Sequence, residues 1–157
     1  MKNILIAGIG NRLRGDDGFG PRVIDILSTY SLPENVEIRD VGTAGITIAT
    51  DFSDYNEILF LDAMEMEGAP GKIIMDLIKI ENINENISEL AKTSLHEVGL
   101  EGLLHFSKAI GALPPKVILI GCKPKNIDIS LDLSKEVEEA TVNAARMVID
   151  YLEKKDK

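Results

Sequence analysis

The chain has 157 residues, of which 45% are hydrophobic and 27% are charged, with a formal net charge of −9. These proportions exclude a disordered chain, and the length fits one domain, so we expect residues 1–157 to form a single domain. The acidic charge without a basic cluster disfavours nucleic-acid binding, and apolar runs of about seven residues are too short to cross a bilayer.

Two features indicate the cellular compartment. The first residues, Met1-Lys2-Asn3, carry no signal-peptide pattern. The chain has one cysteine, Cys122, which cannot form an internal disulfide and which fits a reducing environment. We therefore expect a soluble, cytoplasmic protein that does not bind a membrane.

The first strand and the loop after it are the most informative stretch. Residues 3–7 are mostly apolar and predict a buried strand, and a glycine-rich turn follows from Gly8 to Pro21. Such turns usually bind an anion at the start of the next helix. Here Asp16 and Asp17 would repel a phosphate, and Leu13 replaces the third glycine of the G-x-G-x-x-G fingerprint. A cation or metal site is therefore favoured over a nucleotide site, which stays a weaker alternative.

The next elements alternate helix and strand. Apolar residues with helical spacing run from Val23 to Tyr30, after Pro21 in a first turn that tolerates proline. Residues 36–41 alternate as a half-buried strand does, and residues 46–52 predict a short helix. Residues 57–61 predict a strand that is buried on both faces.

The second half of the chain completes a layered fold. Residues 72–77 predict a strand that follows a connection too short for a helical crossover, so it should run antiparallel at an edge. A helix through residues 100–110, a buried strand at 117–122 and a helix capped by Ser134 follow. We predict a three-layer α/β/α sandwich, phosphorylase/hydrolase-like, with a five-stranded mixed, twisted sheet and one antiparallel edge strand.

Acidic residues follow the first three predicted strands. They are Asp16 and Asp17, then Asp40, then Asp62, and the carboxyl ends of these strands should share one edge of the sheet. Each acid also has an ordinary structural explanation, since a carboxylate can stabilise a helix start or a turn. Two neighbouring carboxylates cannot both cap one helix, so one of the pair should point elsewhere.

A histidine adds a nitrogen ligand to these carboxylates. His96 lies where a helix should begin, which favours a neutral, metal-binding imidazole, although a surface or core role is equally open. His105, nine residues later, should face the opposite side of that helix, and Cys122 should be a small core residue. An acid of the first loop, Asp62 and His96 form an O/O/N set that suits nickel or zinc. The chain has neither an H-E-x-x-H motif nor a G-x-S-x-G turn.

Several segments resemble one enzyme family in order and spacing. They read G-N-x-L-x-G-D-D-G-x-G from Gly10, D-V-G-T-A-G from Asp40, L-D-A from Leu61, G-A-P-G from Gly68, S-L-H-E-V-G-L from Ser94 and I-G-C-K-P from Ile120. This series resembles the hydrogenase maturation endopeptidases, which trim the C-terminal extension of the large subunit of nickel-iron hydrogenases.

The resemblance implies a site and a substrate. It implies that Asp17, Asp62 and His96 contact nickel and act in cleavage, with Asp16, Asp40, Gly42 and Thr43 as supporting or substrate-loop residues. The nickel would be carried by the precursor of a [NiFe]-hydrogenase large subunit, and no organic cofactor is implied.

Two points stay open at this level. A non-catalytic nickel-sensing chaperone that holds the precursor is the alternative, whereas the acidic charge disfavours peptidyl-tRNA hydrolysis, which occurs on a related fold. The abundance of Ile, Lys, Glu and Asn indicates an AT-rich genome, as in methanogenic archaea, where the partner would be a deazaflavin-reducing hydrogenase.

Overall fold

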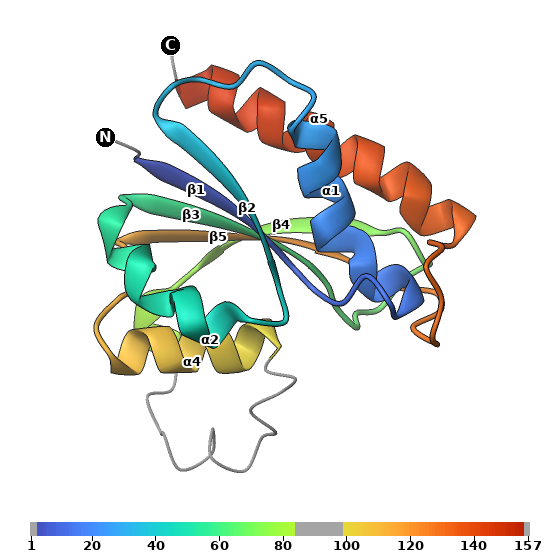
Figure 1. The fold of residues 1–157 in the computed structure, drawn as a ribbon, viewed down its shortest axis with the longest axis horizontal. Coiled ribbons are helices and arrows are strands. Elements are labelled where there is room, and N and C mark those ends of the chain that lie inside the picture. Colours follow the sequence, from blue (N-terminus) through green and yellow to red (C-terminus); the bar gives the residue numbers. More distant parts are fainter. Residues whose placement is uncertain (1–2, 84–98, 156–157) are drawn as a thin grey trace.

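The computed structural model describes residues 3–83 and 99–155 (Figure 1). Its elements, in chain order, are β1 (Ile4–Ile9), the 3₁₀-helix η1 (Gly15–Gly18), α1 (Phe19–Leu27), β2 (Val36–Gly42), α2 (Gly45–Ile48), η2 (Ala49–Asp54), β3 (Glu57–Ala63), β4 (Ile73–Ile78), η3 (Ile80–Asn82), α4 (Leu100–Ala109), β5 (Lys116–Cys122) and α5 (Lys135–Lys155). Strands and helices alternate as the hydrophobic pattern predicts.

The strands form one five-stranded sheet in the order β2-β1-β3-β5-β4. β1, β2, β3 and β5 run parallel to one another, whereas β4 pairs antiparallel with β5 at the edge. The predicted mixed sheet with one antiparallel edge strand is therefore confirmed. Because β1 and β3 lie inside the sheet, their residues are buried on both faces, as their continuous apolar sequences require.

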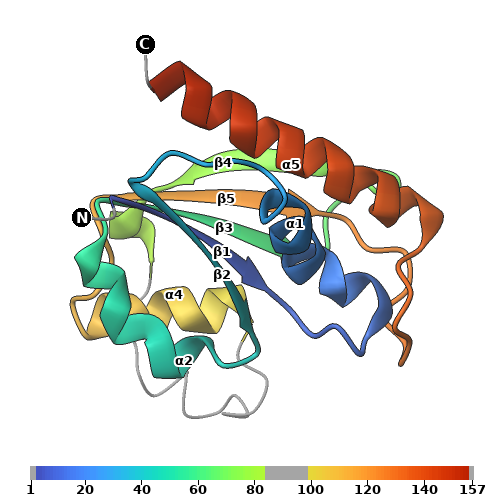
Figure 2. The ribbon, with the colours of Figure 1, turned by 45° about the horizontal axis from the view of Figure 1, so that its top comes forward.

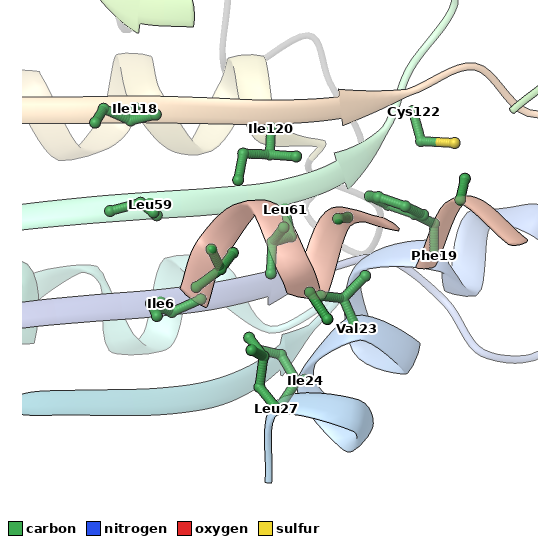
Figure 3. Packing of buried hydrophobic residues seen from close by; sticks show 14 of the residues in the cluster. Ile6, Phe19, Val23, Ile24, Leu27, Leu59, Leu61, Ile118, Ile120 and Cys122 are labelled. Atoms are coloured by element: carbon green, nitrogen blue, oxygen red, sulfur yellow. The ribbon is translucent and has the colours of Figure 1, made fainter. Parts of the chain in front are cut away.

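Helices cover both faces of the sheet (Figures 1 and 2). α1 and α5 lie on one face, and α2 and α4 lie on the other. Alternate residues of each strand enter two separate apolar clusters, so Leu61 faces α1 and α5 while Phe60 faces α2 and α4. Figure 3 shows the first cluster, in which Phe19 and Val23 of α1 pack near Leu61. Burial of each such side chain stabilises the folded state by about 1.5–3 kcal/mol relative to leaving it exposed.

One close approach fixes α1 on the sheet. A Cβ atom at Gly20 would lie 2.3 Å from the carbonyl oxygen of Leu61 and 2.5 Å from that of Ile9. Glycine is therefore required for α1 to sit directly over the ends of β1 and β3. This packing sets the position of the loop between β1 and α1, where the acidic pair lies.

Two local predictions need correction. α1 ends at Leu27, so Tyr30 lies beyond it and is exposed. The hydroxyl groups of Ser28 and Thr29 donate to carbonyl oxygens of the last turn, which competes with helix continuation. The short helix predicted at residues 46–52 is instead one α-helical turn, α2, followed by the 3₁₀-helix η2.

Cys122 lies in the first apolar cluster, as predicted (Figure 3). Burial, with a smaller effect from the charge of Asp16, raises the pKa of its thiol to about 12, so it packs as a neutral group. Among the described residues, no helix combines the length and the hydropathy needed to span a bilayer.

Candidate active site

The loop between β1 and η1 is folded around Asp17. The backbone N–H of Asn11 donates to Oδ2 of Asp17 over 2.8 Å. Gly10 has a φ of 135°, and a Cβ atom there would lie 2.0 Å from the carbonyl oxygen of Asp17. Only glycine permits this approach. The glycine-rich sequence therefore serves to hold a carboxylate at the carboxyl end of β1.

Asp17 and Asp62 share a cavity of about 230 Å³ at this edge of the sheet. The cavity is lined by Ile9, Gly10, Asn11, Arg14, Asp17, Gly42, Thr43, Asp62, Ala63 and Gly99. Gly42 ends β2 and Thr43 follows it, so the carboxyl ends of three neighbouring parallel strands all contribute. Four residues that the resemblance assigns to the site therefore meet in one place.

Asp62 is the penultimate residue of β3 and is only 9% exposed. Burial, and then the negative charge of nearby Asp17, raises the pKa of its carboxyl to about 8, which the backbone N–H of Ala63 only partly opposes. The carboxyl therefore favours the protonated form near neutral pH. A cation entering the cavity would reverse this preference, because it stabilises the carboxylate.

Asp16 has a different position from its neighbour. It is fully buried, and its carboxylate accepts hydrogen bonds from the N–H groups of Lys125, Asn126 and Ser134 and from the Ser134 hydroxyl, at 2.7–3.0 Å. Burial alone would raise the pKa of Asp16, but the hydrogen bonds, led by that of Asn126, together lower it. Asp16 thus joins the loop after β1 to the segment before α5, and it does not line the cavity.

Asp40 was expected in the turn after the second strand and lies instead within that strand. It belongs to β2, opposite Gly8, and accepts a hydrogen bond from the Arg12 guanidinium, at 2.9 Å. Arg12 also pairs with Asp25 of α1 at 2.7 Å. Asp40 therefore ties the first loop to β2 and α1, and it is not among the residues that line the cavity.

The two arginines of the first loop have separate roles. From the sequence, two explanations of Arg12 and Arg14 are open: they balance the charge of the acidic pair, or they contact an acidic part of a partner. Arg12 pairs with acids from other elements, Asp25 and Asp40, while Arg14 lines the cavity. Asn11, Arg14 and Gly99 were not predicted as site residues. For Asn11 and Arg14, the signal was their position inside the glycine-rich loop.

The predicted third ligand cannot be placed. His96 lies within residues 84–98, outside the described part of the chain. Within residues 3–83 and 99–155, no three side chains of His, Cys, Asp or Glu are grouped closely enough to hold a metal ion. The described residues supply Asp17 and Asp62 of the predicted set. His105, on α4, and Cys122 do not line the cavity.

Comparison with known proteins identifies the family. Residues 21–151, more than half of the chain, match the family HycI, described as hydrogenase maturation protease. The chain belongs to the hydrogenase maturation protease family. The family resemblance drawn from the loop and strand-end motifs is thereby confirmed.

Individual relatives agree with this assignment. The Methanocaldococcus jannaschii protein MJ0253 is 34% identical over 161 aligned residues, which cover 98% of each chain. The Escherichia coli hydrogenase 2 maturation protease is 30% identical over 151 residues, 95% of this chain and 90% of the relative. The crystal structure of the hydrogenase 2 maturation peptidase of Thaumarchaeota archaeon SCGC_AB-539-E09 is 56% identical with a TM-score of 0.76, covering 96% of this chain and 98% of that one. These matches confirm the α/β fold and place the chain among peptidases.

Proposed function

We propose that the protein is an endopeptidase that removes the C-terminal extension of a [NiFe]-hydrogenase large-subunit precursor after nickel has been loaded. Membership in the maturation protease family supports the reaction class. The cavity that holds Asp17 and Asp62 at the carboxyl edge of the sheet supports the site. In this proposal the nickel belongs to the substrate, and the protein needs no organic cofactor.

The observation that carries the proposal is the burial of Asp62 in the same cavity as Asp17. Its carboxyl is buried beside a like-charged group, and both effects favour the protonated form. A divalent ion presented by the precursor favours the carboxylate, so binding would release a proton and give Asp62 a partner. A precursor without nickel offers no such compensation. The site would therefore discriminate between loaded and unloaded precursor through the free energy of ionising Asp62.

The resemblance assigns nickel recognition to Asp17, Asp62 and His96, a mixed oxygen and nitrogen set that suits a borderline ion. For the cleavage step we propose that water attacks the carbonyl carbon of the scissile peptide bond. A carboxylate, Asp17 or Asp62, accepts the proton of that water, and the proton then passes to the leaving amine as the C–N bond breaks. The products are the mature subunit with a new carboxylate terminus and a free C-terminal peptide.

The finer assignments rest on composition. The residues that indicate an AT-rich genome favour a deazaflavin-reducing hydrogenase as the partner. The single cysteine, free and buried, fits action in a reducing cytoplasm. The partner can be tested by offering the protein different large-subunit precursors and following each for cleavage.

The decisive test is intact mass spectrometry of a nickel-loaded precursor incubated with the protein. Wild type should remove one defined C-terminal peptide, and Asp17→Ala, Asp62→Ala and His96→Ala should not. Asp150→Ala is the matched control, because Asp150 is an exposed aspartate of α5 far along the chain from these residues. If wild type binds the precursor and its mass never changes, the chaperone alternative replaces the endopeptidase.

A further inference from the structure

Four large apolar side chains are exposed next to the site. Leu13 is 59% exposed, Ile127 46%, Ile129 91% and Leu131 70%. Leu13 belongs to the loop between β1 and η1, and the other three lie in the segment that links β5 to α5. We call these four residues the apolar patch. Scattered apolar side chains are ordinary on a protein surface, but several together mark an interaction site.

The patch is one unit because the two segments are hydrogen-bonded to each other. The N–H of Ser130 donates to the carbonyl oxygen of Leu13, and the N–H of Gly15 donates to the carbonyl oxygen of Ser130, both at 2.9 Å. Leu13 is therefore held beside the middle of the segment that carries Ile129 and Leu131. Figures 1 and 2 both show the chain before α5 running alongside the loop after β1.

The segment that carries the patch is held in place despite its exposure. The Asn126 side chain accepts a hydrogen bond from the N–H of Asp128 over 2.8 Å, and the Ser130 hydroxyl oxygen accepts one from the N–H of Asp132 over 3.0 Å. The buried carboxylate of Asp16 fixes both ends of this segment, as described above. A surface held in this way loses little conformational entropy when a partner binds.

The patch is continuous with the cavity. Arg14 forms a β-bridge with Ser130, in the middle of the patch, and also lines the cavity that contains Asp17 and Asp62. A polypeptide whose end enters the cavity would thus pass directly over or beside the patch. The same loop positions the reactive carboxylate and displays Leu13.

The charges around the patch indicate the chemistry of its partner. Asp128 and Asp132 alternate with the apolar residues and are exposed, and the whole chain has a net charge of −9. Exposed carboxylates favour a partner with basic side chains and repel an acidic one. The complementary surface is therefore apolar, with basic groups opposite Asp128 and Asp132.

We propose that the apolar patch is the docking surface for the precursor itself, which binds it through an apolar segment flanked by Lys or Arg side chains while its C-terminal region enters the cavity. This inference rests on the proposed function. It assigns specificity for the protein substrate to residues 127–131 and Leu13, and leaves Asp17 and Asp62 to the chemistry. Loss of the patch should therefore change binding and leave the chemical step intact.

The test variant is the double substitution Ile129→Ser and Leu131→Ser. Both side chains are largely exposed, so the fold should be unchanged. The control is Leu77→Ser with Ile110→Ser, which removes two other exposed apolar side chains, at 61% and 43% exposure, from β4 and the end of α4. The patch variant should raise the KM for nickel-loaded precursor about 10- to 100-fold, with kcat within about twofold. The control should change neither.

A second measurement separates the two proposals. The Kd of the precursor is measured by calorimetry with three proteins that all carry Asp62→Asn, so that the precursor stays intact. One has no other substitution, one also has the patch substitutions, and one also has the control substitutions. Weaker binding by the patch variant without cleavage by wild type would support docking and overturn the endopeptidase. Normal cleavage by wild type, with KM and Kd unaffected by the patch variant, would overturn docking alone. Self-association of wild type that the patch variant abolishes, with precursor binding unchanged, would show that a second copy occupies the patch, and would also overturn it.

Discussion

A carboxyl group is buried at each end of β3, and the groups around the two carboxyls differ in charge. At the amino end, Glu57 is 4% exposed, accepts a hydrogen bond from the Tyr151 hydroxyl and pairs with Lys155 at 2.9 Å. At the carboxyl end, Asp62 is 9% exposed and faces the charge of Asp17. The same strand thus carries one carboxylate that is paired with a hydroxyl and an ammonium group, and one carboxyl that is buried near another acid.

The amino-end cluster is built from residues far apart in the sequence. The ammonium groups of Lys116 and Lys155 lie 5.5 and 5.3 Å from the centre of the Tyr151 ring. Burial, and then the hydrogen bond to Glu57, raises the pKa of Tyr151. This cluster fastens the end of α5 to β3. The comparison teaches that burial of an acid alone does not mark a functional site, and that the charge of its neighbours decides.

The largest contrast should appear in activity. Asp62→Asn should lower the rate of precursor cleavage by about 10²- to 10⁴-fold, the range for loss of an acid–base group. Glu57→Gln should leave the rate within about twofold. The rates are measured by mass spectrometry at equal concentrations of folded protein. Equal losses in both variants would erase the distinction between the two ends of β3.

The pH dependence of stability should also differ. Between about pH 4, where Asp62 ionises in the unfolded chain, and pH 8, where it ionises in the folded one, only the folded state retains the proton. Each pH unit in this window destabilises wild type by up to about 1.4 kcal/mol. Above pH 8 the loss stops growing. Asp62→Asn removes this penalty, so its Tm should match wild type near pH 4 and exceed it most at pH 8.

The control for the pH prediction is Asp150→Asn, at an exposed position of α5. Its Tm should follow that of wild type at every pH from 4 to 9 in thermal denaturation followed by circular dichroism. A Tm difference between Asp62→Asn and wild type that does not grow with pH would contradict the raised pKa of Asp62.

The next effect concerns the carboxylate beside Asp17. Asp16→Ala should lower the free energy of unfolding by about 3 kcal/mol, because it leaves several buried donors without their charged acceptor. The stabilising contribution of the low pKa is present above the ordinary value for aspartate and is lost as the pH falls below it. Urea denaturation at pH 7 measures the loss. Asp17→Ala, which removes one bond from the Asn11 N–H, should lose less.

The smallest effect is expected at the amino end of β3. Glu57→Gln should lower the free energy of unfolding by about 1–2 kcal/mol, because Lys116 and Lys155 are 44% and 34% exposed and can be solvated when the carboxylate is gone. Urea denaturation measures this loss as well, with Lys155→Met as the partner variant. Additive losses in the double variant would show that the Glu57–Lys155 pair contributes nothing.

Much of the fold could be read from local sequence. Continuous apolar runs predicted the buried parallel strands, and the short connection before Ile73 predicted the antiparallel edge strand. Asp62 and one acid of the first loop could be predicted to meet because parallel strands end at one edge of a sheet, and the family resemblance selected Asp17. The resemblance added Gly42 and Thr43, which line the cavity.

Other features depended on contacts between distant segments. Asp16 and Asp17 are equivalent by sequence, but η1 turns one toward Ser134 and the other toward the cavity. Asp40 was expected near the site, but it pairs with Arg12, which also pairs with Asp25, and it does not line the cavity. No local pattern announces such ion pairs, because they form only after α1 has packed on the sheet.

The sequence by itself determined that acids and glycines lie at the ends of the predicted strands. It thereby determined the edge of the sheet at which a site could form, because the pattern of apolar residues predicts parallel strands whose carboxyl ends meet. The tertiary structure decided which acids line the cavity and in which direction the pKa of Asp62 shifts. A pKa depends on burial and on nearby charges and hydrogen bonds, which come from segments distant in the sequence, as for Asp16 and Ser134, 118 residues apart.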